Sequence, residues 1–103
     1  MSASINVARA KGSLSAAFAD YLTIGGASRQ EQHAATVRVG ACIDRLYEIF
    51  AQSNPPAALL CTQIEWNEIV EAKIKDPSDV AFYKDEMSSF HNYYYETLRS
   101  DDE

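Results

Sequence analysis

The sequence predicts an all-α protein, a compact bundle of three to four helices, and three observations support this. Gly (4) and Pro (3) are scarce among the 103 residues, so long helices are favoured over many short strands. Ser and Asp stand at several positions typical of helix starts. Apolar residues then recur at steps of three and four, the period of one helix face. A chain of this length is expected to form one domain, residues 1–103.

The first predicted helix covers residues 13–23. Ser13 is a good N-cap, and Gly25-Gly26 is a strong stop signal. Residues 1–12 are ambiguous, because an earlier helix start would place Gly12 inside the helix at a cost of about 1 kcal/mol relative to Ala. Two expectations therefore stand for this segment, a flexible terminus or an earlier helix start.

The second predicted helix, residues 29–52, has the clearest start in the chain. Ser28 and Glu31 have the spacing of a capping box, in which the Ser side chain bonds a first-turn amide. The helix ends before Pro55-Pro56 and would be roughly 36 Å long, so we expect it to be the spine of the domain. Its apolar stripe has a helical period: Ala35, Val39, Cys42, Ile43, Leu46, Ile49 and Phe50.

The third predicted helix covers residues 57–75. Pro55-Pro56 can both end the second helix and open this one, because Pro is well tolerated in a first turn. Leu60 and Ile64 are expected to face inward, with Cys61 as a further inward candidate. Three residues continue the apolar surface: Trp66, Ile69 and Val70. The other face carries carboxylates at steps of three: Glu65, Glu68 and Glu71.

The fourth predicted helix covers residues 77–99, with Asp76 as its cap and Pro77 at its first position. Residues 100–103 are expected to be a frayed acidic tail. An apolar seam runs along the helix at alternating steps of three and four: Val80, Tyr83, Met87, Phe90 and Tyr94. The seam covers only two heptads, so packing within the domain explains it as well as a coiled coil does.

This last helix carries more aromatic surface than one seam can hide. Phe82, Tyr93 and Tyr95 lie off the seam, and six of the eleven aromatic residues fall in this stretch. Tyr and Trp are enriched at interface hot spots, because their large rigid rings also carry a polar group. We therefore predict that Phe82, Tyr93, Tyr95 and Trp66 contact a partner. Filling of the core is the alternative, which we favour for Phe90 and Tyr94.

Charge is unevenly distributed along the chain. The net charge is −6, composed of +1 for residues 1–60 and −7 for residues 61–103. Such a surface repels nucleic acid and attracts a basic or mixed basic and apolar protein partner. The carboxylates predicted to face this partner are Glu65, Glu68, Asp85 and Glu86. The alternative is that these acidic residues only keep a small protein soluble.

Residues that carry chemistry are few. His33 and His91 are the only histidines, and no Glu-x-x-His, phosphate loop or nucleophile elbow occurs in the sequence. Cys42 and Cys61 are too few for a disulfide framework and are expected to be buried free thiols. We therefore predict no catalytic residue, no cofactor and no metal site. A Cys–His pair formed by the fold is the remaining enzymatic alternative.

The sequence has no apolar run of about 18 residues and no secretory signal, which predicts a cytoplasmic protein without a membrane span. The predicted function is that of a small acidic regulator that binds and inhibits or sequesters a partner protein. Bacterial and phage antagonists, toxin immunity proteins and anti-activators have this general profile. An acidic mimic of nucleic acid and an accessory subunit of a larger assembly are the alternatives, and a homodimer is compatible with all three.

Overall fold

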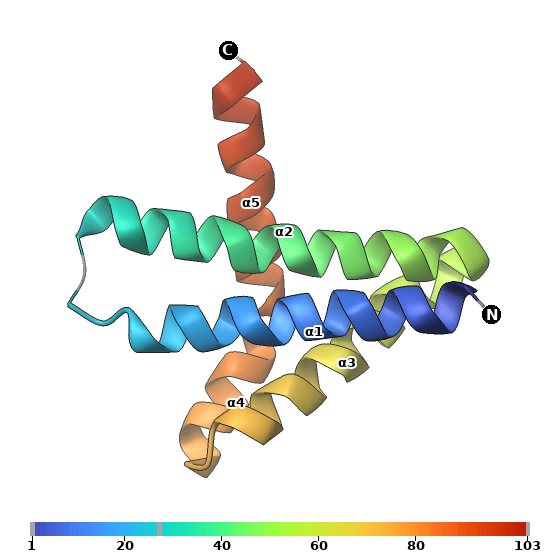
Figure 1. Ribbon diagram of the computed structural model, residues 1–103, viewed down its shortest axis with the longest axis horizontal. Helices are drawn as coiled ribbons and strands as arrows, with labels where there is room; N and C mark the ends of the chain where they lie inside the picture. Colours follow the sequence, from blue (N-terminus) through green and yellow to red (C-terminus); the bar gives the residue numbers. More distant parts are fainter. Residues whose placement is uncertain (1, 27, 103) are drawn as a thin grey trace.

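The structure, a computed structural model, describes the backbone of residues 2–26 and 28–102 and the side chains of residues 5–26 and 28–100. These residues form five α-helices and one short 3₁₀ helix, so the all-α prediction is confirmed, while the count of three to four helices is too low (Figure 1). The elements are α1 (Ser2–Thr23), α2 (Arg29–Ser53), η1 (Pro55–Ala57), α3 (Ala58–Lys73), α4 (Pro77–Asp85) and α5 (Met87–Asp102).

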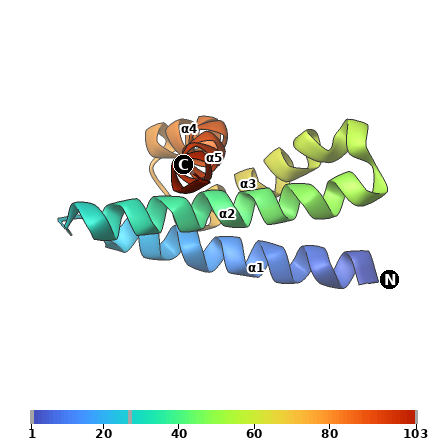
Figure 2. The same ribbon diagram turned by 90° about the horizontal axis from the view of Figure 1, so that it is seen from above.

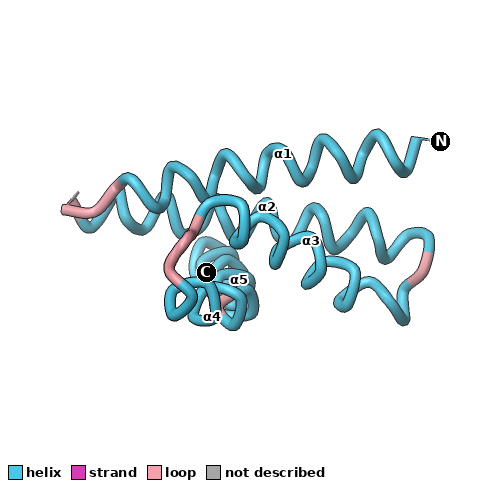
Figure 3. Tube along the Cα trace, turned by 90° about the horizontal axis from the view of Figure 1, so that it is seen from below, coloured by secondary structure: helices cyan, strands magenta, loops and turns pink. Residues whose placement is uncertain are grey.

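The helices form a flat cross, with extents of 41 × 40 × 20 Å. Helices α1 and α2 form an antiparallel hairpin, and α5 crosses the hairpin steeply (Figure 1). Helices α3, α4 and α5 lie together on one side of the hairpin (Figure 2). The connections between the helices are short (Figure 3). Helix α2 is the centre of this arrangement, because α1, α3 and α5 all pack on it.

Helix α1 is longer than the predicted 13–23, because it begins at Ser2 and continues through Gly12. Ala10 and Leu14, on either side of that glycine, are buried in the core. Their burial offsets the cost of about 1 kcal/mol that a glycine brings to a helix interior. Residues 2–12 are therefore helical. The chain leaves α1 through Gly26, whose φ of +88° is a conformation that glycine adopts readily.

Helix α2 matches its prediction within one residue. The Ser28 side chain accepts a hydrogen bond from the Glu31 amide at 3.2 Å, as the capping pattern predicted. Gly40 is also buried, although it was not part of the predicted stripe. The predicted stripe is buried or half-buried along its whole length: Ala35, Val39, Cys42, Ile43, Leu46, Ile49 and Phe50.

Helix α3 is rotated relative to the prediction. Leu60 and Ile64 were expected to face inward, but they are 64% and 47% exposed. The residues that face inward instead are Ala58, Thr62, Trp66, Ile69 and Val70. Trp66 explains the rotation, because it is the largest fully buried side chain, and its ring packs against Phe18 of α1 at 4.8 Å and Phe90 of α5 at 5.7 Å. Burying this ring turns Leu60 and Ile64 outward.

The predicted helix 77–99 is divided at Glu86 into α4 and α5. Its start is as predicted, since the Asp76 side chain caps the amides of Ser78 and Asp79. At the break, two side chains of α3 donate to backbone carbonyls: Trp66 Nε1 to Tyr83 at 2.8 Å, and Gln63 Nε2 to Lys84 at 3.0 Å. Tertiary hydrogen bonds therefore accompany a break that the local sequence does not signal.

Helix α5 continues to Asp102, so residues 100–102 are helical rather than frayed, and Glu103 lies outside the described residues. The apolar seam of α5 is buried near the start of the helix and exposed near its end. Met87 and Phe90 are 2% and 5% exposed, and Tyr94 is half-buried. Leu98, four residues further along the same face, is 42% exposed. This end of α5 extends past α2 (Figure 1).

Candidate functional site

The crossing of α5 over α2 brings two helix backbones into close contact at Gly40. A Cβ atom at this position would lie 2.3 Å from the carbonyl oxygen of Phe90 and 2.6 Å from the Cβ of Tyr94. Only glycine leaves room for such an approach. The crossing therefore places two predicted interface tyrosines, Tyr93 and Tyr95, next to polar side chains of α2.

On one side of Gly40, Asp44 of α2 is the centre of a polar cluster with two residues of α5. The Nε2 of His91 lies 2.9 Å from Oδ1 of Asp44, and the Tyr95 hydroxyl donates to the same oxygen. The side chains of Asp44 and His91 are only 13% and 16% exposed. A carboxylate so far from solvent needs hydrogen-bond donors, and α5 supplies two of them.

The Asp44 cluster favours the protonated form of the Tyr95 phenol. The hydrogen bond to the Asp44 carboxylate, with a smaller contribution from burial, raises the pKa of Tyr95 to about 12. Ionisation of the phenol would remove the donated proton and place a second negative charge beside Asp44. Tyr95 therefore fastens α5 to α2 while its hydroxyl is protonated.

On the other side of Gly40, His33 of α2 and Tyr93 of α5 form a second, more exposed contact. His33 Nδ1 and the Tyr93 hydroxyl share a hydrogen bond of 2.6 Å, and the two rings meet edge to face at 5.4 Å. An open hollow of about 540 Å³ lies beside this pair, lined by Arg29, Gln30, Gln32, His33, Thr36 and Tyr93. The hollow is wide and open to solvent, so it does not enclose a ligand.

These contacts change the interpretation of the surplus tyrosines. Tyr93 and Tyr95 are 37% and 38% exposed, so part of each ring faces solvent as expected. Their hydroxyls, however, bond to His33 and Asp44 within the chain. The polar group that would make each ring useful to a partner already stabilises the fold. His91 is likewise held by Asp44.

Trp66 is not a surface residue, so its prediction as a partner-binding residue is wrong. Its side chain is fully buried, and its indole N–H donates to the Tyr83 carbonyl. The order of residues along α3 offered a signal that would have identified this. Ala58, Thr62 and Trp66 lie four residues apart, and the largest ring on a helix tends to occupy its buried face.

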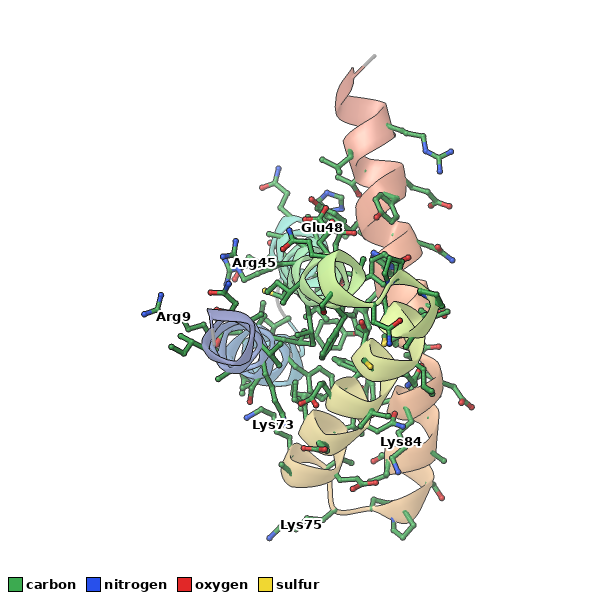
Figure 4. All side chains as sticks on the ribbon, turned by 90° about the vertical axis from the view of Figure 1, so that its right-hand side faces the viewer. Arg9, Arg45, Glu48, Lys73, Lys75 and Lys84 are labelled. Carbon is green, nitrogen blue, oxygen red and sulfur yellow. The ribbon has the colours of Figure 1, made fainter. Side chains whose placement is uncertain are left out.

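The predicted carboxylates of α3 have partners within the chain. Lys11 of α1 lies 2.9 Å from Glu65 and also pairs with Glu68, which together raise the pKa of the lysine, chiefly through the hydrogen bond to Glu68. Glu71 pairs with Lys84 of α4, whose side chain lies between α3 and α4 (Figure 4). Glu65 is the more enclosed of the Lys11 partners, with a side chain 22% exposed. We therefore expect Glu65 to serve mainly the fold.

The remaining predicted residues lie on or near α4. Phe82 is 56% exposed, with its ring edge to face against Tyr83 at 5.1 Å, so it stays a candidate for partner contact. Asp85 is exposed, and Glu86 is half-buried at the break between α4 and α5. The Ser89 hydroxyl donates to the Glu86 carboxylate at 3.4 Å.

Three exposed aliphatic side chains lie close together on α3, and the sequence did not predict this surface. Leu59, Leu60 and Ile64 are 58%, 64% and 47% exposed, and we call this surface the α3 outer face. Glu68 and Glu71 lie four and seven residues beyond Ile64, on the following turns of the same side of the helix. Their side chains remain 55% and 56% exposed despite their lysine partners. The surface is therefore apolar at one end and acidic at the other.

Groups that could carry chemistry are sparse in the described residues. No set of three or more His, Cys, Asp or Glu side chains among them is placed to hold a metal ion. Cys42 and Cys61 are half-buried free thiols, and burial raises the pKa of Cys42, which disfavours the reactive thiolate. No helix in the described part of the chain has both the length and the apolar character that crossing a membrane requires.

Comparisons of the chain with protein-family models, with curated proteins and with solved structures found no match. The candidate site therefore rests on geometry. The α2–α5 crossing is a set of contacts that hold the fold together, and the α3 outer face is an exposed apolar surface.

Proposed function

We propose that this protein is a small acidic interaction module that binds a partner protein through the α3 outer face, and so inhibits or sequesters that partner. The observation that carries the proposal is the exposure of Leu59, Leu60 and Ile64 within the first two turns of one helix. Exposed aliphatic residues are ordinary when they are scattered, but a contiguous patch is typical of an interaction site. These side chains have no polar group that the fold uses.

The charge next to the patch indicates what kind of partner fits it. Glu68 and Glu71 continue the same side of α3, and the second part of the chain, residues 61–103, carries −7. A partner with an apolar ridge and Lys or Arg about two turns further along would complement this face. Phe82 and the exposed ring edges of Tyr93 and Tyr95 would extend the contact if the partner is large.

Mimicry of nucleic acid is less well supported than protein binding. Seven carboxylates would have to stand in for phosphates: Glu65, Glu68, Glu71, Asp76, Asp79, Asp85 and Glu86. Four of them are already engaged within the chain, because Glu65 and Glu68 pair with Lys11, Glu71 pairs with Lys84, and Asp76 caps α4. The proposal also includes no catalytic activity, since His33 and His91 hold Tyr93 and Asp44. It places the encounter in the cytoplasm, where free thiols such as Cys42 and Cys61 stay reduced.

The test compares binding by the intact chain and by a double variant of the α3 outer face, Leu60→Gln with Ile64→Gln. Gln keeps good helix propensity and an aliphatic stem, so the variant removes mainly the apolar ends of the two side chains. Proteins captured from the source organism are identified by mass spectrometry and purified, and their affinity is measured by calorimetry. We expect the double variant to weaken binding at least 30-fold, since central apolar anchors each contribute about 1–2 kcal/mol or more.

The matched control is Ile5→Gln, which removes an aliphatic side chain of α1 that is 55% exposed. It should leave the affinity unchanged. Binding that is equal for the intact chain and the α3 double variant would disprove the proposed face. An affinity that falls steeply with salt and is insensitive to the double variant would instead favour the acidic mimic.

A further inference from the structure

A small hollow of about 190 Å³ lies where side chains of α1, α2 and the first part of α5 meet. Three of the residues around it are aromatic and one is a glutamate. The full lining consists of Tyr21, Thr36, Glu86, Ser89, Phe90 and Tyr93. Pockets for drug-sized ligands occupy about 300–1,000 Å³, so this hollow fits one small chemical group rather than a whole ligand of that size.

Glu86 brings a half-buried negative charge to this hollow. Lys11 and Lys84 pair with glutamates of α3, but in the described part of the chain no Lys, Arg or His side chain pairs with Glu86. The Ser89 hydroxyl donates to the Glu86 carboxylate at 3.4 Å, a long hydrogen bond that neutralises no charge. A carboxylate partly withdrawn from water is stabilised when a cation lies beside it.

The aromatic rings of the hollow favour the same sign of charge. The face of an aromatic ring is partly negative and attracts a cation that lies within about 6 Å of the ring centre. The rings of Tyr21 and Phe90 meet at 5.1 Å and 87°, so they form a corner rather than a stack. Burial raises the pKa of Tyr21, and the charges of Tyr83 and Glu86 act in the same direction. The negative charge of Glu86 therefore reaches the ring corner.

An organic cation suits this lining better than a metal ion does. Ca²⁺ and Mg²⁺ need about six or more oxygen ligands, whereas the hollow offers one carboxylate and a few hydroxyls. No metal-binding set of three His, Cys, Asp or Glu side chains occurs among the described residues. A methylated ammonium group spreads its charge over its methyl groups and binds to ring faces, as in the aromatic cages that recognise choline and methyl-lysine.

We propose that this hollow binds a methylated ammonium group, with Glu86 balancing its charge and the rings of Tyr21, Phe90 and Tyr93 contacting its methyl groups. The hollow shares Tyr21 and Thr36 with a second hollow of about 350 Å³, which leaves room for the rest of a longer molecule. The group belongs either to a small molecule such as choline or to a methylated lysine side chain. No residue of α3 lines either hollow, so this inference does not depend on the α3 outer face.

The first experiment tests whether the hollow recognises the positive charge. Choline chloride is titrated into the ¹⁵N-labelled chain, and the amide shifts of Ser89, Phe90 and Tyr93 are followed by NMR. Sodium chloride is the control for ionic strength, and 3,3-dimethylbutanol is the uncharged isostere of choline. We expect saturable shifts with a Kd on the order of 1 mM for choline and at least about 10-fold weaker binding of the isostere. Equal binding of the two would overturn the proposal.

Two pairs of variants test the lining. Glu86→Gln keeps the shape of the side chain and should weaken choline binding at least about 10-fold, because the neutral amide no longer balances the bound charge. Glu48→Gln, the same change at an exposed residue of α2 outside the hollow, should leave the affinity unchanged. Tyr21→Phe should also bind, whereas Tyr21→Leu should bind more weakly because it removes a ring. The amide spectrum shows whether each variant is folded, and unchanged affinity in a folded Glu86→Gln chain would disprove the site.

A second titration separates the two sources of the ammonium group. A short Gly-Ser peptide that carries one trimethyllysine is compared with choline and with the same peptide carrying unmodified lysine. Tighter binding of the trimethyllysine peptide than of choline assigns the hollow to a modified side chain, and the reverse order assigns it to a small molecule. Both orders support the proposal. Equal binding of the modified and unmodified peptides together with no saturable shift from choline would overturn it.

Discussion

The α2–α5 crossing and the α3 outer face both expose large side chains, and they differ in how those side chains are used. At the crossing, Tyr93 and Tyr95 are each more than a third exposed, yet their hydroxyls bond to His33 and Asp44. On α3, Leu60 and Ile64 are more exposed and have no polar group to engage. An exposed ring can thus be part of the fold, while the exposed aliphatic side chains leave apolar area in contact with solvent.

The difference follows from what the side chains of each surface do for the fold. Asp44 is a nearly buried carboxylate, and its loss of hydration is offset by the His91 and Tyr95 donors of α5. The α3 outer face is not needed to fill the core, because Trp66 on the opposite side of α3 already does so. Substitutions at the crossing should therefore change stability, whereas substitutions on the α3 outer face should change binding.

The largest effect is expected at Gly40. Gly40→Ala would place a methyl group within 2.3 Å of a backbone oxygen that cannot move aside cheaply. We expect a loss of at least about 2 kcal/mol in the free energy of unfolding, measured by urea denaturation. Gly12→Ala is the matched control, since nothing lies within 4 Å of that position, and it should gain about 1 kcal/mol. A gain at both sites would mean that the two helices do not meet at Gly40.

The two sides of the crossing should differ in strength. Asp44→Ala leaves the His91 and Tyr95 donors without their shared acceptor in a poorly hydrated site, and we expect a loss of about 2 kcal/mol in the free energy of unfolding at pH 7. Tyr93→Phe removes one hydrogen bond at an exposed site and should cost about 0.5–1 kcal/mol. Equal losses of unfolding free energy for the two variants in urea denaturation would contradict the view that the Asp44 cluster stabilises the crossing more than the His33–Tyr93 contact does.

Alkaline pH should release the Asp44 cluster. The pKa of Tyr95 is raised to about 12 in the folded chain from an ordinary value of 10.0, so its contribution is fully present below pH 10 and is lost as pH rises through 12. The stability difference between the intact chain and Tyr95→Phe should therefore shrink between pH 10 and pH 12. Burial also raises the pKa of Tyr21, but both chains share that residue, so the comparison isolates Tyr95. A difference that stays constant over this range would place the phenol outside the cluster.

The smallest effect on stability is expected on the α3 outer face. Leu60→Gln with Ile64→Gln should lower the free energy of unfolding by less than about 1 kcal/mol, because both side chains are already largely in water. Thermal melting monitored by circular dichroism is the measurement. A loss of several kcal/mol would show that these side chains support the core, and the proposed interface would have to be sought at Phe82 instead.

Local sequence was informative wherever a signal acts through neighbouring residues. Ser28 and Asp76 cap α2 and α4 as predicted, because a side chain and the amides it bonds lie within one turn. The buried stripe of α2 followed from its spacing for the same reason. The sequence left the start of α1 open, because Gly12 disfavours a helix locally. Burial of Ala10 and Leu14 stabilises the helix only once α2 is in place.

By itself the sequence determined the all-α class, the caps, and the helical periodicity that continues through Glu86. Only the tertiary structure decided the rotation of α3, the break at Glu86 and the use of the tyrosine hydroxyls. The physical reason is shared by all three. Trp66 reaches the Tyr83 carbonyl across 17 residues and Asp44 meets Tyr95 across 51, and such contacts depend on how helices are placed in space rather than on the residues beside them.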